Sequence, residues 1–157
     1  MRVITLLTDF GIRQEFVGTM KGVILGIAPD VQLVDFTHLI SPQNIKEGAM
    51  SLWRAYPFFP KDTVHLFVVD PGVGTKRRPM AAKIGDQYFV GPDNGLLTPV
   101  IEDAERDRRP MEFVHLQNSK YWLAKVSNTF HGRDIFSPVA AHLTNGVALG
   151  ELGSSFN

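Results

Sequence analysis

Apolar residues along this chain form short continuous runs that alternate with stretches of helical spacing. A continuous run of β-branched and apolar residues predicts a buried strand, and apolar positions three or four residues apart predict an amphipathic helix. We therefore expect strands at residues 2–7, 31–36, 63–69, 80–84, 88–90, 111–116 and 121–125. We expect helices at residues 17–27, 41–56, 96–101 and 132–143. This alternation favours an α/β fold, with a mostly parallel sheet flanked by helices on both faces.

Turn-forming and charged residues set the boundaries between these elements. Ser41 is the expected N-cap of the second helix, because Pro42 suits its first position. Residues 102–109 carry seven charges in eight positions, which indicates a solvated loop without a function of its own. The length of 157 residues fits one globular domain, and we see no linker or internal repeat.

Charge and cysteine content narrow the classes of function. Sixteen basic residues balance sixteen acidic ones, with five of each sign in residues 1–60 and eleven of each in residues 61–157. No basic half is present to follow a phosphate backbone, so we expect no nucleic-acid partner. Cysteine is absent, which excludes disulfides and thiolate metal sites. No apolar run approaches the ~18 residues of a membrane span and no signal peptide is recognisable, so we expect a soluble, cytoplasmic domain without a membrane partner.

Polar side chains gather where the predicted strands end. Ligands of open α/β sheets bind outside the carboxyl ends of the strands, and Asp9, Asp35 with His38, and Asp70 follow the first three strands. Together with His131 these residues could form an oxygen and nitrogen metal site. No compact ligand motif supports that site, so a metal-dependent phosphohydrolase is an alternative rather than the leading hypothesis.

Three glycine-containing segments carry the remaining chemistry. Residues 70–78 place two glycines in a loop, which permits positive φ and a close approach to a ligand, but the spacing is not that of a P-loop. Residues 91–95 are interpreted as a tight turn. Residues 129–134 precede the last helix, where free amides favour an anion or a developing negative charge. Within them, Arg133 and Asp134 are interpreted as structural residues that pair either with each other or with the helix terminus.

Six of these segments, in order and spacing, resemble the S-adenosyl-L-methionine hydroxide adenosyltransferases, which are relatives of fluorinating and chlorinating enzymes. The segments are residues 8–11, 20–22, 34–38, 69–75 with 77–78, 91–97 and 129–136. The resemblance implies hydrolysis of S-adenosyl-L-methionine to adenosine and L-methionine without a cofactor or metal. It also implies a homotrimer. Residues 1–157 would form one α/β domain of the N-terminal type, without the β-rich C-terminal domain that follows in the family.

The resemblance also assigns residues to roles. The family's catalytic aspartate, arginine and histidine fall on Asp70, Arg77 and His131. The aspartate that holds the ribose hydroxyls falls on Asp9, and contacts to the ribose and its 5′ carbon fall on Phe130 and the Gly132 backbone. Relatives that use halide carry tyrosine at position 70 and serine at position 132, so water is the expected nucleophile.

The chemistry of these residue types agrees with that reaction. Methionine leaves a sulfonium as a neutral thioether and needs no general acid, so the difficulty lies in activating water. Arg77 can stabilise charge on the attacking water, while either Asp70 or His131 accepts or orients its proton. Asp70 could instead orient Arg77. Arg78 is the neighbouring rival, and the spacing from Asp70 favours Arg77.

One further hypothesis concerns turnover. In relatives, the second domain of a neighbouring subunit in the trimer supplies most contacts to adenine and methionine. A domain of this kind could therefore be a module that binds S-adenosylmethionine or adenosine without hydrolysing it.

Overall fold

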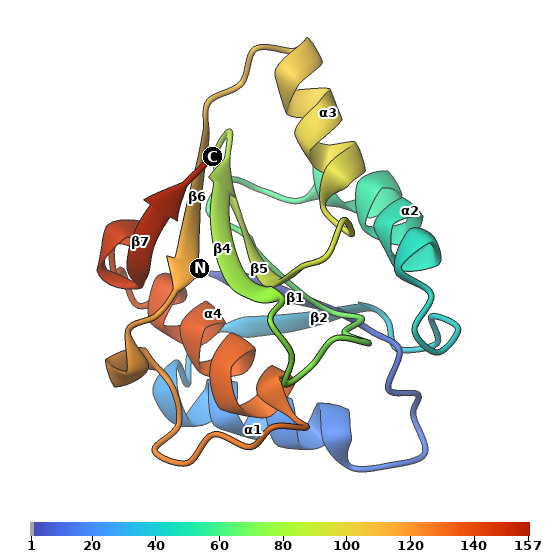
Figure 1. The fold of residues 1–157 in the computed structure, drawn as a ribbon, viewed down its shortest axis with the longest axis vertical. Helices are drawn as coiled ribbons and strands as arrows, with labels where there is room; N and C mark the ends of the chain where they lie inside the picture. The colour runs from blue at the N-terminus through green and yellow to red at the C-terminus, as the bar shows by residue number, and fades with distance from the viewer. Residues whose placement is uncertain (1) are drawn as a thin grey trace.

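The computed structural model describes residues 2–157 and shows a seven-stranded sheet with helices packed on both faces (Figure 1). The strands are β1 (Val3–Thr8), β2 (Gln32–Thr37), β3 (Val64–Val68), β4 (Arg78–Ile84), β5 (Gln87–Asp93), β6 (Met111–Leu116) and β7 (Gly153–Phe156). The helices are α1 (Phe16–Ile27), α2 (Ile45–Ala55), α3 (Thr98–Arg106) and α4 (Ser137–Thr144), and one π-helical turn, Gly132–Phe136, leads into α4. Short 3₁₀ turns lie at Tyr56–Phe58, Ser119–Tyr121 and Leu149–Glu151.

The sheet is parallel in one half and antiparallel in the other. Its strand order is β2-β1-β3-β5-β4-β6-β7. The first three pairings are parallel and the last three are antiparallel, so the prediction of a mostly parallel sheet is right only for the first half. The reason is the two-residue turn Gly85-Asp86 between β4 and β5, where Gly85 has a φ of 62°. Such a turn can join only antiparallel neighbours.

Alternate residues of the central strands feed two separate hydrophobic cores. Leu6 packs with the cluster beneath α1 and α4, whereas the next residue, Leu7, packs with the cluster beneath α2 and α3. Figure 1 shows α1 and α4 together on one side of the sheet and α2 and α3 on the other. The predicted covering of both faces is confirmed. No helix formed by residues 2–157 combines the length and apolar composition that a membrane span requires.

The start of α2 and the nature of the charged run differ from the sequence predictions. The side chain of Asn44, rather than Ser41, caps α2 by accepting the Glu47 amide at 3.0 Å. Residues 98–106 form α3, so most of the expected loop is helical. Val100 and Ala104, four residues apart, are fully buried, and this narrow apolar stripe is enough to hold a helix whose other faces are charged.

The edge of the antiparallel half was also predicted incorrectly. Residues 121–125 form no strand, because the Leu123 amide donates to the Asp134 carbonyl at 2.9 Å and holds this stretch against the π-helical turn before α4. The edge position beside β6 is taken instead by β7, from a segment for which no strand was predicted. Strand β7 pairs along one side only, and its four residues, Gly-Ser-Ser-Phe, carry no apolar alternation by which a strand could be recognised without its neighbour.

Candidate active site

A cavity of about 340 Å³ opens at the carboxyl ends of β1 and β3, within the usual size range of small-molecule sites. Its wall is formed by Asp9, Phe10, Phe16, Pro42, Gln43, Val68, Asp70, Val73, Thr129, Phe130, His131 and Gly132. Five of the six predicted site residues are among them. Three phenylalanines pack against one another on one side, with ring centroids 5.4 to 5.9 Å apart.

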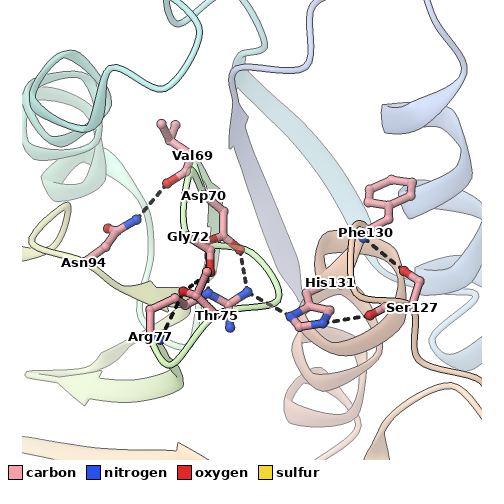
Figure 2. A network of polar contacts seen from close by, with 9 residues as sticks. All are labelled: Val69, Asp70, Gly72, Thr75, Arg77, Asn94, Ser127, Phe130 and His131. Atoms are coloured by element: carbon pink, nitrogen blue, oxygen red, sulfur yellow. Dashed lines mark hydrogen bonds and ion pairs between the residues drawn. The ribbon is translucent and has the colours of Figure 1, made fainter.

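Asp70 and Arg77 form a bidentate ion pair at one end of the cavity. Asp70 follows β3, and Arg77 returns to it from the residue just before β4. Arg77 donates from Nε to Oδ1 at 2.9 Å and from Nη2 to Oδ2 at 2.5 Å (Figure 2). The two side chains are only 5% and 9% exposed, so little water competes for this pair. A fork-to-fork pair of this kind fixes both groups in direction as well as in charge.

His131 extends the pair into a chain of three groups. Arg77 Nη2 lies 2.9 Å from His131 Nδ1, and His131 Nε2 lies 2.8 Å from the carbonyl of Ser127, as Figure 2 shows. A guanidinium can only donate and a carbonyl can only accept, so His131 carries its proton on Nε2 and accepts through Nδ1. Burial, and then the charge of Arg77, lower the pKa of His131 below its usual 6.5. His131 is therefore neutral at pH 7.

The two loops that carry this chain touch at Gly74. The loop between β3 and β4 turns at Gly74, with a φ of 77°, and a Cβ placed there would lie 2.4 Å from the carbonyl oxygen of Asn128. Only glycine allows this approach, because it has no Cβ and adopts positive φ without strain. A second anchor lies at the start of the same loop, where Asn94 donates to the Val69 carbonyl at 2.8 Å.

Asp9 faces the cavity from the end of β1. Its Oδ2 accepts the backbone amide of Gln43 at 2.7 Å. That amide belongs to a residue with a φ of 63°, an uncommon conformation for a side chain with a Cβ. Within residues 2–157 no hydrogen bond occupies Oδ1 of Asp9, which leaves this oxygen to a ligand.

Asp35 and His38 do not join the cavity, contrary to the expectation that their carboxylate and ring would lie beside Asp9 and Asp70. The Asp35 carboxylate accepts from Lys21 and from His38 Nε2, each at 2.8 Å. The other ring nitrogen of His38 bonds to Thr8 Oγ1, and the residue is only 6% exposed. In the described part of the chain, no three histidine, aspartate or glutamate side chains gather in a way that could hold a metal ion.

The two neighbouring arginines, Arg78 and Arg133, bind partners outside the chain of Asp70, Arg77 and His131. The Arg78 guanidinium stacks over the Phe156 ring at 3.7 Å and is not part of the cavity wall, so Arg77 is the arginine that reaches Asp70. Arg133 Nε donates to Asp134 at 2.7 Å, which confirms their pairing.

Comparison with known proteins places this arrangement in a family. The profile described as the SAM hydroxide adenosyltransferase N-terminal domain matches residues 4–153. The chain belongs to this family. It is 45% identical, over 96% of its length, to the (R)-S-adenosyl-L-methionine hydrolase of Salinispora tropica, and 41% identical over 98% to that of Thermus thermophilus. A fluorinase of Actinoplanes is 29% identical over 99% of the chain.

Solved structures agree with this assignment. A crystal structure of an uncharacterised conserved protein from Thermotoga maritima superposes with a TM-score of 0.93 at 43% identity over 98% of this chain. The match covers 58% of the Thermotoga maritima protein. The matches to the named relatives cover 56% of the Salinispora tropica hydrolase, 61% of the Thermus thermophilus hydrolase and 58% of the Actinoplanes fluorinase. The chain thus spans a little over half the length of the relatives that it matches.

Within this family's fold, seven residues of the cavity wall were not among the predicted site residues: Phe10, Phe16, Pro42, Gln43, Val68, Val73 and Thr129. Phe10 lies in the loop after β1, where a phenylalanine has no periodic signal, although it directly follows the candidate Asp9. Phe16 is the first residue of α1, one position before the predicted start of that helix. Gln43 was taken as part of a helix, and its positive φ has no signature in the sequence. Gly132 is closely packed, because a Cβ there would lie 3.3 Å from the Phe130 ring.

Proposed function

We propose that this chain provides the catalytic groups for hydrolysis of S-adenosyl-L-methionine to adenosine and L-methionine. The observation that carries the proposal is the hydrogen-bonded chain of Asp70, Arg77 and His131 at the end of a cavity that Asp9 also faces. Relatives at 41 to 45% identity are named (R)-S-adenosyl-L-methionine hydrolases, which supports the same substrate here.

In the proposed reaction, a water oxygen forms a bond to the ribose 5′ carbon as the bond from that carbon to sulfur breaks. The bonding pair stays on sulfur, so methionine leaves as a neutral thioether. One proton is released from the water, and it must be accepted at the site. The reaction needs no metal or cofactor for its leaving group.

Asp70 is the group best placed to accept or orient that proton. The Nδ1 lone pair of His131 is already used by Arg77, and its Nε2 is a donor, so His131 has no free acceptor. Each carboxylate oxygen of Asp70 accepts one bond from Arg77 and keeps another lone pair toward the cavity that it lines. Arg77 binds both oxygens of this carboxylate and is not part of the cavity wall, so it acts on the water through Asp70.

Asp9 and the phenylalanines are proposed to hold the nucleoside. The free Oδ1 of Asp9 can accept from the vicinal ribose hydroxyls, and Phe130 offers an apolar face beside them. Holding the 5′ carbon in line with water is worth up to about 7–11 kcal/mol in well-oriented reactions. Positioning is therefore as important for the rate as the proton acceptor.

The remaining walls of the substrate site are proposed to come from elsewhere. The chain spans 52 to 61% of the length of the related hydrolases. We propose that the working unit is a homotrimer in which a second domain contacts adenine and methionine, and that it acts in the cytoplasm.

The test is incubation of the purified chain with S-adenosylmethionine, with and without EDTA, followed by chromatography for adenosine and methionine. Adenosine that appears equally in both arms supports metal-free hydrolysis by this chain. Loss of product with EDTA would favour the metal-dependent alternative. If no product forms but calorimetry detects adenosine binding, the chain by itself is a binding module. This outcome is worth testing because the chain covers only part of the length of its relatives.

A further inference from the structure

The carboxylate of Asp134 is the most enclosed charged group near the cavity, and the reaction described above does not use it. Asp134 is 1% exposed and lies in the π-helical turn that follows His131. Its Oδ2 accepts the amide and the hydroxyl of Ser127, both at 2.8 Å, and also Arg133 Nη2 at 3.3 Å. Its Oδ1 accepts Arg133 Nε at 2.7 Å. Four donors therefore converge on one buried carboxylate.

The same Ser127 is the residue that holds His131. Its carbonyl lies 2.8 Å from His131 Nε2, and its hydroxyl oxygen accepts the amide of Phe130 at 3.0 Å. Figure 2 shows both bonds meeting at Ser127, on the side of the imidazole away from Arg77. Asp134 thus folds residues 127–131 into a closed turn without touching the cavity, whose lining does not include it.

The Ser127 carbonyl and the Arg77 guanidinium both require that His131 carry its proton on Nε2. With the carbonyl at Nε2, the proton is on Nε2 and the lone pair of Nδ1 faces the Arg77 guanidinium. If the carbonyl turned away, the Nδ1–H tautomer would also become available. In that tautomer the Nδ1–H group of His131 and the Arg77 guanidinium would both be donors, so no hydrogen bond could form between them. The guanidinium would then keep only its bonds to Asp70.

We propose that Asp134 is a positioning residue that fixes the tautomer of His131 through Ser127, and thereby the orientation of the Asp70–Arg77 pair. This inference rests on the proposed function for its effect on turnover, but its effect on His131 is independent of substrate. Second-layer groups that orient an imidazole in this way are known to be important wherever the tautomer matters.

The decisive variant is Asp134→Asn, which keeps the shape of the side chain. Asparagine offers only one acceptor oxygen, and its amide N–H groups would face the donors that Asp134 now satisfies. The matched control is Arg133→Gln. It removes the partner of Asp134 that is 37% exposed and leaves both Ser127 bonds in place.

The primary readout is nitrogen-15 NMR of His131 near pH 7.5, without substrate. In the wild type and in Arg133→Gln we expect Nε2 protonated and Nδ1 unprotonated. In Asp134→Asn we expect a mixture of tautomers and a fall in kcat of roughly ten- to a hundredfold, the range for losing one charge-assisted hydrogen bond. KM should change less than kcat, because Asp134 does not line the cavity.

Two results would overturn the inference. One is a folded Asp134→Asn variant that keeps the Nε2–H tautomer and wild-type turnover. The other is lost turnover with an unchanged tautomer, which would show that Asp134 acts by another route. If the wild type does not hydrolyse S-adenosylmethionine, the proposed function fails, yet the tautomer measurement still decides the role of Asp134.

A second variant covers the case in which Asp134→Asn does not fold. Ser127→Ala removes only the hydroxyl that joins Asp134 to the Phe130 amide. We expect the Nε2 proton of His131 to exchange with solvent roughly tenfold faster than in the wild type, as the turn loosens. An unchanged exchange rate together with unchanged turnover would contradict the inference.

Discussion

Substitution of Gly74 by alanine should separate Arg77 from His131 without changing either residue. The new methyl group would lie 2.4 Å from the Asn128 carbonyl oxygen, whereas real Cβ atoms approach such atoms no closer than 3.0 Å. The two loops must therefore part by at least about 0.6 Å. A shift of that size along the Arg77–His131 contact would take it from 2.9 Å to about 3.5 Å, beyond hydrogen-bonding distance.

The expected loss of folding stability in Gly74→Ala has two parts that can be measured separately. A φ of 77° costs an alanine about 1–2 kcal/mol of folding stability, whatever surrounds it. Losing a hydrogen bond to a charged group adds roughly 1.5–3 kcal/mol. Gly146→Ala supplies the matched control, because Gly146 has a φ of 94° and nothing within 4 Å of its added Cβ. Gly146→Ala should lose the stability that a positive φ costs an alanine, without the further loss from a broken hydrogen bond.

Stability would be measured by urea unfolding, and turnover by release of adenosine from S-adenosylmethionine. We expect Gly74→Ala to lose more stability than Gly146→Ala and to lose roughly a hundredfold in turnover, as is found when reacting groups are misplaced by about 1 Å. Gly146→Ala should keep wild-type turnover. Equal stability losses in the two variants, with turnover intact in both, would refute the reasoning that contact between these loops sets the active geometry.

Three further predictions follow from the same contacts. Arg77→Ala should lower turnover by about 10²–10³-fold because Asp70 loses its partner, whereas Arg78→Ala should leave it unchanged; similar losses in both would reject the assignment. Asp9→Ala should weaken adenosine binding in calorimetry by roughly tenfold or more, and unchanged affinity would remove the ribose assignment. Burial lowers the pKa of His65 to about 4, so the unfolded chain takes up this proton near pH 6.5 and the folded chain only near pH 4. Stability should therefore fall by about 3 kcal/mol as the pH drops through that range, and His65→Gln should lose this part of the pH dependence; parallel curves for the two proteins would contradict it.

The sequence by itself located the groups of the candidate site. Asp9 and Asp70 are adjacent to strands that apolar runs mark clearly, and parallel strands bring their carboxyl ends to one edge. The glycines and polar residues of the loops at 70–78 and 129–134 are equally visible. These features are local, because each depends on which neighbours along the chain are buried, and hydrophobic spacing reports that directly.

Tertiary structure alone decided which of these groups bond to one another. Arg77 and His131 are 54 residues apart, and only their shared approach across the Gly74–Asn128 contact makes one a partner of the other. Asp35 and His38 lie at the same edge of the sheet, but their hydrogen bonds to Lys21 and Thr8 hold them outside the cavity. Edge strand β7 and the tautomer of His131 likewise depend on partners distant in the sequence, β6 and Arg77. A hydrogen bond needs a donor and an acceptor within about 3 Å, and periodicity along a chain carries no information about that distance.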